Sequence, residues 1–207
     1  MKDARHELVE RFYRYVSVPS QSRDNGGVQV PSTEGQWDMA ELLKAECEAL
    51  GLVDLEISKA CVLTGKLPAR LPEGFAGSVP SVGFCTHMDT VDVCLSPEIH
   101  PQMIANYDGG DIVLNEEQQI VMAAAEHPEL RKFVGQDIIV TDGTSVLGSD
   151  NKAAIANVMT ALSTLAGDDS LYHGDMHQGH GAIRHALGRL CPRRRMRLVR
   201  LEEYGLF

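Results

Sequence analysis

The sequence predicts a layered α/β domain, and three observations support this fold class. Short apolar runs alternate with turn-rich stretches through the middle of the chain. Apolar residues at helical spacing occur on both sides of this region. With 207 residues, of which 43% are hydrophobic, the chain can bury one sizeable core. We therefore expect a layered helix/sheet/helix arrangement with a functional site at the strand ends.

The individual elements follow from local patterns. The first helix is predicted from an apolar stripe at Leu8, Phe12 and Val16. The spacing Thr33-x-x-Gln36 is that of a capping box and predicts the start of a second helix. Strands are predicted at 53–57, 61–67, 82–86, 112–114 and 138–141, and a third helix is predicted from about residue 150.

A histidine and an aspartate follow the apolar run at 80–86. Residues two apart on a strand project to the same side, so the Asp89 carboxylate can hold the His87 imidazole by its other ring nitrogen. An imidazole held in this way suits a zinc ligand. A strand-end histidine that only bonds to a nearby acid gives the same pattern, so this motif leaves both interpretations open.

A second acidic residue, Asp150, stands where the third helical pattern begins. The buried stripe of that helix includes Ile155, Val158 and Met159. One interpretation of Asp150 is an N-cap residue that accepts backbone N–H groups. The other is a metal-binding carboxylate placed at the helix start.

Six segments, in this order along the chain, carry a resemblance to a known family. They read ERFYRYV at 10–16, QVPSTEGQW at 29–37, GFCTHMDT at 83–90, NYDGGDI at 106–112, GQDIIVTDG at 135–143 and LGSDNKA at 147–153. Together they resemble the peptidase T family of tripeptide aminopeptidases, which belongs to the aminoacylase and carboxypeptidase-like zinc peptidases. The resemblance covers about residues 7–175.

This resemblance implies a hydrolase that releases the N-terminal residue of tripeptides by zinc-activated water attack, with small peptides as its substrates. In the family pattern His87 would bind one of two zinc ions and Asp150 would bridge both. Asp89 would orient His87 as part of the catalytic machinery. The position after the bridge is commonly a second aspartate, and because this chain has Asn151 there, we assign that residue no metal role.

The chain departs from the family pattern after Asp175. Members of the family continue into a strand that ends in TPDEE, whose first Glu is the general base and whose second binds zinc, whereas this chain reads MHQGHGAIR at 176–184. The general base is therefore unassigned, and the later ligands and the lid or dimerisation domain have no counterpart. The Glu202-Glu203 pair lies too far from Asp175 to replace them.

Charge changes sign at the same place. Residues 176–207 carry a net charge of +5, whereas residues 1–175 carry −15. We therefore expect the N-terminal part of a zinc-peptidase catalytic domain at 1–175, incomplete at its C-terminal side, followed by a divergent tail at 176–207 that arises from a frameshift or a truncated gene. The isolated chain is then expected to be inactive. The alternative function is a truncated, non-catalytic fragment with a partial metal site.

Two features of the tail have other interpretations. Its histidines, with His173, have spacings that could hold a metal adventitiously. Its arginines at 193–195 could contact nucleic acid, but a solvated cluster is the simpler interpretation, since interleaved aromatic residues are missing.

Composition indicates the environment in which the protein works. A net charge of −10 argues against nucleic acid or an anionic membrane as a partner. The five cysteines are scattered and form no Cys-x-x-Cys pair, which is typical of a reducing compartment. The N-terminus has no apolar segment of signal-peptide length. We expect a cytoplasmic protein whose uncovered sheet edge favours aggregation or a homo-oligomer.

Overall fold

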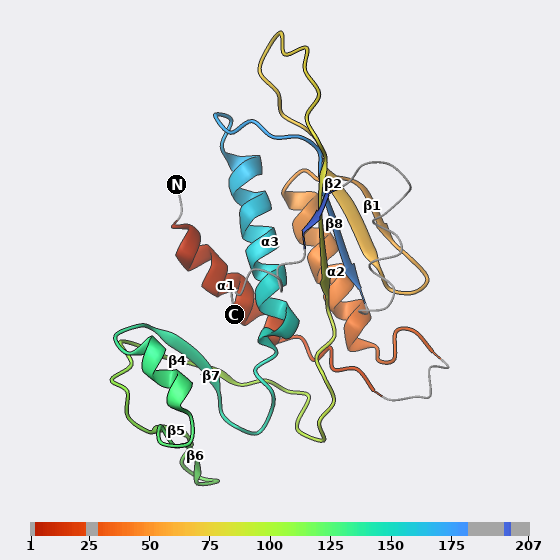
Figure 1. The fold of residues 1–207 in the computed structure, drawn as a ribbon. Helices are drawn as coiled ribbons and strands as arrows, with labels where there is room; N and C mark the ends of the chain where they lie inside the picture. The colour runs from red at the N-terminus through yellow and green to blue at the C-terminus, as the bar shows by residue number, and fades with distance from the viewer. Residues whose placement is uncertain (1–2, 24–28, 182–196, 200–207) are drawn as a thin grey trace.

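The computed structural model describes residues 3–23, 29–181 and 197–199. Its main body is a five-stranded sheet covered by helices, and a smaller lobe of short strands lies at one end of it (Figure 1). The helices are α1 (Ala4–Val16), α2 (Gly35–Ala49) and α3 (Ser149–Gly167), with a 3₁₀ helix η1 (Pro128–Phe133). The strands are β1 (Val53–Ile57), β2 (Leu63–Leu67), β3 (Val82–His87), β4 (Pro101–Ile104), β5 (Ile112–Asn115), β6 (Ile120–Met122), β7 (Ile138–Thr141), β8 (Met176–Gly181) and β9 (Arg197–Val199).

The main sheet has the strand order β1-β2-β8-β3-β9. Strand β8 occupies the centre, antiparallel to β2 and parallel to β3. The register places His87 of β3 opposite Gly181 of β8, so both strands end at the same edge of the sheet. Side chains that follow β3 therefore emerge at this edge, beside the start of α3.

The core lies between the helices and one face of the sheet. Leu63 of β2 and Phe84 of β3 pack there with apolar side chains of all three helices. Arg11 of α1, which is buried, ties the helices together, because its guanidinium bonds to Glu46 of α2 at 2.6 Å and to Thr160 of α3 at 3.1 Å. The α/β fold class is confirmed, and among the described residues the helices cover this one face (Figure 1).

The smaller lobe lies in the chain between β3 and α3. Strands β4 and β7 form one antiparallel pair, and β5 and β6 form another. A separate small core of Tyr107, Ile112 and Val140 holds the lobe together. The lobe interrupts the sequence between the two candidate metal-binding segments, so the fold must bring those segments back together.

Several boundaries differ from the predictions. The capping box at Thr33 is wrong: Glu34 is the N-cap of α2, no side chain caps the helix, and the Thr33 hydroxyl donates to the Gln21 carbonyl instead. Strands β4 and β6 were not predicted, because they are short and partly exposed.

The predicted boundary between residues 175 and 176 coincides with the first residue of β8, so the sheet continues past it. The remaining tail predictions, including the arginines at 193–195, His185 and the Glu202-Glu203 pair, lie outside the described residues. Among the helices that are described, none has the length and apolar character that crossing a bilayer requires.

Candidate metal centre

His87 is the last residue of β3, and its ring lies between two aspartates. On one side, Nδ1 is 3.0 Å from the backbone carbonyl oxygen of Asp89 and 3.4 Å from Asp89 Oδ1. On the other side, Nε2 is 2.8 Å from Oδ1 of Asp150. The structure thus brings together the three residues singled out from the sequence, although 63 positions separate His87 from Asp150.

Asp150 reaches His87 because the start of α3 is not regular helix. Gly148 precedes it with φ of +72°, a left-handed conformation that suits glycine. Asp150 itself has φ −85° and ψ 101°, and its peptide bond to Asn151 is cis. Gly148 is the N-cap and no side chain caps the helix, so in this structure the Asp150 carboxylate faces His87 instead of the backbone N–H groups.

The two aspartates raise the pKa of His87. Burial by itself lowers the pKa of His87, but the hydrogen bond and negative charge of Asp89, together with the bond to Asp150, outweigh burial and raise it. The side chains of His87 and Asp89 are 13% and 19% exposed, whereas that of Asp150 is 86% exposed. His87 and Asp89 therefore lie at the end of a partly buried strand, and the site is open to solvent on the Asp150 side.

The donor set fits a zinc ion in type and direction. Imidazole nitrogen and carboxylate oxygen are both ordinary zinc ligands. Nε2 of His87 faces the Asp150 carboxylate, while Nδ1 is hydrogen-bonded to the backbone carbonyl oxygen of Asp89 and lies 3.4 Å from its carboxylate. Ligand histidines are commonly oriented through the other ring nitrogen by a carbonyl or a carboxylate. Asp89 Oδ1 is buried and has no hydrogen-bond partner in the structure, so its negative charge acts on the nearby ring.

A complete site needs more donors than these. A structural or catalytic zinc ion takes three or four protein ligands. Within residues 3–23, 29–181 and 197–199, no group of three or more His, Cys, Asp or Glu side chains is arranged to hold a metal ion. His87 and Asp150 can therefore supply two donors of such a site.

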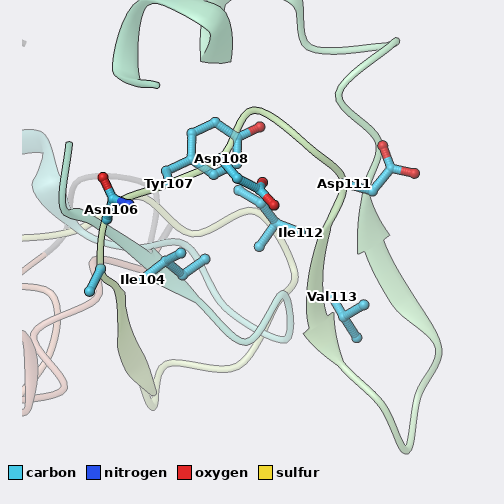
Figure 2. Close-up of a pocket in the computed structure, with 8 residues that line it drawn as sticks. Ile104, Asn106, Tyr107, Asp108, Asp111, Ile112 and Val113 are labelled. Atoms are coloured by element: carbon cyan, nitrogen blue, oxygen red, sulfur yellow. The ribbon is translucent and has the colours of Figure 1, made fainter. Parts of the chain in front are cut away.

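The Asn106–Asp111 motif forms a different feature, a pocket of about 310 Å³ in the smaller lobe (Figure 2). Both carboxylates of the motif accept hydrogen bonds from backbone N–H groups. Asp108 Oδ1 accepts from Gly110 N at 2.8 Å, and Asp111 Oδ1 accepts from Ala124 N at 2.8 Å. The Tyr107 hydroxyl donates to the Gly110 carbonyl. These contacts give the motif a structural role in shaping the lobe.

Two buried polar side chains beside the metal-ligand pair were not singled out from the sequence. Lys152 is completely buried two residues after Asp150, and Ser20 is 1% exposed in the loop after α1. The apolar neighbours of Lys152 in a helical pattern suggested burial, but a lysine is normally expected at the surface. Ser20 carried no signal, since serine is common in loops.

Comparison with known proteins identifies the relatives of this chain. No family model matches it. A peptidase T-like protein of Yersinia pestis is 48% identical over 170 residues, which is 82% of this chain and 39% of that protein. Peptidase T of Geobacillus thermodenitrificans is 42% identical over 170 residues, again 82% of this chain and 40% of that protein. The resemblance to the peptidase T family is confirmed.

The fold comparison agrees with the sequence comparison. The crystal structure of aminopeptidase PepT from Bacillus cereus matches with a TM-score of 0.53 at 22% identity, over 84% of this chain and 35% of that one. At this identity the likeness concerns the fold alone. The chain spans about 40% of the length of the curated relatives that it matches.

Proposed function

We propose that this chain is part of a zinc-dependent aminopeptidase that removes the N-terminal residue of tripeptides. The proposal rests on one observation, the His87 ring held between Asp89 and Asp150 at the end of a central strand. The peptidase T relatives support the reaction class, hydrolysis of a peptide bond. The tripeptide preference is carried over from the family.

The proposed roles of the residues are those that the family resemblance implies, and the proximity of the side chains supports them. His87 and Asp150 would hold zinc, with Asp150 as the carboxylate shared between two ions, and Asp89 would orient His87. Zinc at this place would lower the pKa of a water molecule and polarise a peptide carbonyl. The exposed Asp150 side chain leaves the site open to a substrate from the solvent.

The alternative is a non-catalytic fragment with a partial metal site. Two donors are fewer than a stable zinc site requires, and no general base is assigned among the described residues. A chain with these donors alone would bind one zinc ion weakly and leave the barrier to water attack high. This alternative applies to the 207-residue chain, whereas the aminopeptidase applies to the protein of which it would be a part.

A direct assay separates the two. The purified chain is incubated with excess zinc and a tripeptide, and release of the N-terminal residue is followed beside His87→Ala. Turnover that disappears in His87→Ala supports an active enzyme. Weak zinc binding that depends on His87, without turnover, supports the fragment. Zinc binding that is identical in both proteins contradicts the proposed centre.

We also infer that residues 176–207 arise from an altered reading frame. The reversal of charge supports this, and so does the character of β8, where Gln178 and His180 are both 0% exposed in a central strand. Central strands normally carry apolar side chains at such positions. The encoding DNA tests the inference: an alternative frame that reads a TPDEE-like strand after codon 175 supports it, and its absence refutes it.

A further inference from the structure

The loop after α1 contacts the His87 segment directly. Ser20 is buried, and its hydroxyl donates to the carbonyl oxygen of Met88 at 2.6 Å. Backbone bonds extend the contact, from Ser22 N to Thr90 O at 2.9 Å and from Thr90 N to Ser20 O at 3.4 Å. The loop therefore pairs with the chain that carries His87 and Asp89.

The same loop contacts the Asp150 segment through Lys152. The Lys152 ammonium, completely buried, donates to the carbonyl oxygen of Val18 at 2.6 Å. A buried ammonium is costly without a hydrogen-bonding partner, so this bond draws the start of α3 and the loop together. One short loop thus holds both segments that carry the candidate ligands.

Close packing leaves this loop little freedom to move away. A Cβ atom on Gly35, the first residue of α2, would lie 1.8 Å from the carbonyl oxygen of Pro19, so the loop rests directly on the helix backbone. The two ligand segments also touch each other, since a Cβ atom on Gly148 would lie 3.1 Å from Thr90 Cγ2. Both glycines allow an approach that larger residues would prevent.

The exposure of Asp150 makes the backbone position decisive. Its side chain is 86% exposed, so packing around the carboxylate cannot fix its direction. The direction must come from the backbone that leads into α3, and Lys152 anchors that backbone two residues later. Ser20 anchors the backbone of the segment that follows His87 in the same way, through its bond to the Met88 carbonyl.

From this arrangement we infer that loop 17–22 is a clamp that sets the separation of the His87 and Asp150 donors, with Ser20 and Lys152 as positioning residues. The inference rests on the proposed metal centre. It goes beyond the ligands themselves, because Ser20 and Lys152 are not proposed ligands and bond to backbone carbonyls instead. Residues that orient ligands from outside the coordination shell typically change metal affinity by about 10–100-fold when they are removed.

Cobalt(II) titration of the 207-residue chain tests the clamp, because the visible spectrum of bound cobalt reports affinity and coordination geometry without turnover. The variants are Ser20→Ala and Lys152→Met, with His87→Ala as the ligand control. Ser163→Ala is the matched control: its hydroxyl also joins two elements, donating to Glu7 of α1 at 3.0 Å, but it lies 13 residues along α3 from Asp150. Urea unfolding without metal measures the stability of each variant.

The clamp predicts that Ser20→Ala and Lys152→Met raise the cobalt dissociation constant about tenfold or more and shift the visible spectrum. Ser163→Ala should stay within about twofold of the parent chain. If His87→Ala weakens binding but Ser20→Ala behaves like Ser163→Ala, the clamp is refuted and the metal centre stands. If His87→Ala has no effect, the metal centre itself is refuted and the clamp with it. Should Lys152→Met not fold, Ser20→Ala decides.

Discussion

The buried histidine of the central strand should make the stability of the fold depend on pH. His180 is completely buried in β8, with Nδ1 2.5 Å from Thr86 Oγ1 and Nε2 2.7 Å from Gln178 Oε1. The Gln178 oxygen can only accept, so Nε2 carries the proton and Nδ1 accepts from the threonine hydroxyl. Burial lowers the pKa of His180 from 6.5 to about 4, because a charged ring there would lose its hydration.

The size and sign of the effect follow from this shift. Between pH 6.5 and about 4 the unfolded chain binds a proton at His180 while the folded chain does not, so acid favours unfolding. A lowering of about 2.5 pKa units corresponds to about 3 kcal/mol of stability, lost as the pH falls through this window. His87 has a raised pKa, so its contribution to folding stability is lost only as the pH rises above 6.5, outside the range in which His180 acts.

Urea unfolding between pH 4 and 7.5 measures the effect. The parent chain should lose about 3 kcal/mol between pH 6.5 and 4 beyond the loss seen in His180→Phe, which cannot bind the proton. His177→Gln is the matched control, because residue 177 lies on the opposite face of β8, and it should retain the parent slope. An equal slope in the parent chain and His180→Phe would refute the buried, neutral assignment of His180.

Three further predictions concern packing. The Arg70 guanidinium donates to the carbonyls of Leu165, Ala166 and Asp168 at the end of α3. Arg70→Ala should therefore lower the free energy of unfolding in urea by about 2 kcal/mol. Arg70→Lys should recover only part of this stability because lysine lacks the planar guanidinium, and full recovery would contradict the prediction. Glu46→Ala leaves the buried Arg11 without its nearest carboxylate and should cost about 3 kcal/mol, whereas the double variant Arg11→Met with Glu46→Leu should be closer to the parent. The smaller lobe exposes two apolar side chains, Val113 at 54% and Val121 at 49%, which should promote self-association. Light scattering should therefore give a mass that grows with protein concentration, and Val121→Lys should have a lower mass than the parent chain at the same concentration. A monomeric parent chain at high concentration would contradict this.

The parts of the fold that the sequence predicted well have strong periodic patterns. The stripe that includes Ile155 and Met159 correctly placed α3, and the apolar runs at 53–57 and 138–141 have the observed bounds of β1 and β7. Strand β8 escaped prediction because Met176–Gly181 has two glycines and no apolar alternation. It is a strand because both neighbours pair with it, which is tertiary information.

The site was predicted unevenly for a similar reason. The spacing of His87 and Asp89 predicted that they lie close together, and the structure has their side chains 3.4 Å apart, although β3 ends at His87 and Asp89 lies beyond the strand. Periodicity could not show that Asp150 meets His87, since the smaller lobe lies between β3 and α3 in the chain. That expectation came from the family resemblance. Ser20 and Lys152 bond to backbone carbonyls, which every residue has, so the sequence pattern could not predict these partners.

The position of β8 has a consequence for how this protein is made on the ribosome. Strands β2 and β3 do not pair with each other in the sheet order, and only the six residues at 176–181 join them. During translation both strands, and every helix of the described chain, are synthesised before the strand that unites them. The nascent polypeptide therefore carries unpaired edges of β2 and β3 until residues 176–181 have been made, a period in which chaperone binding or misassembly competes with folding.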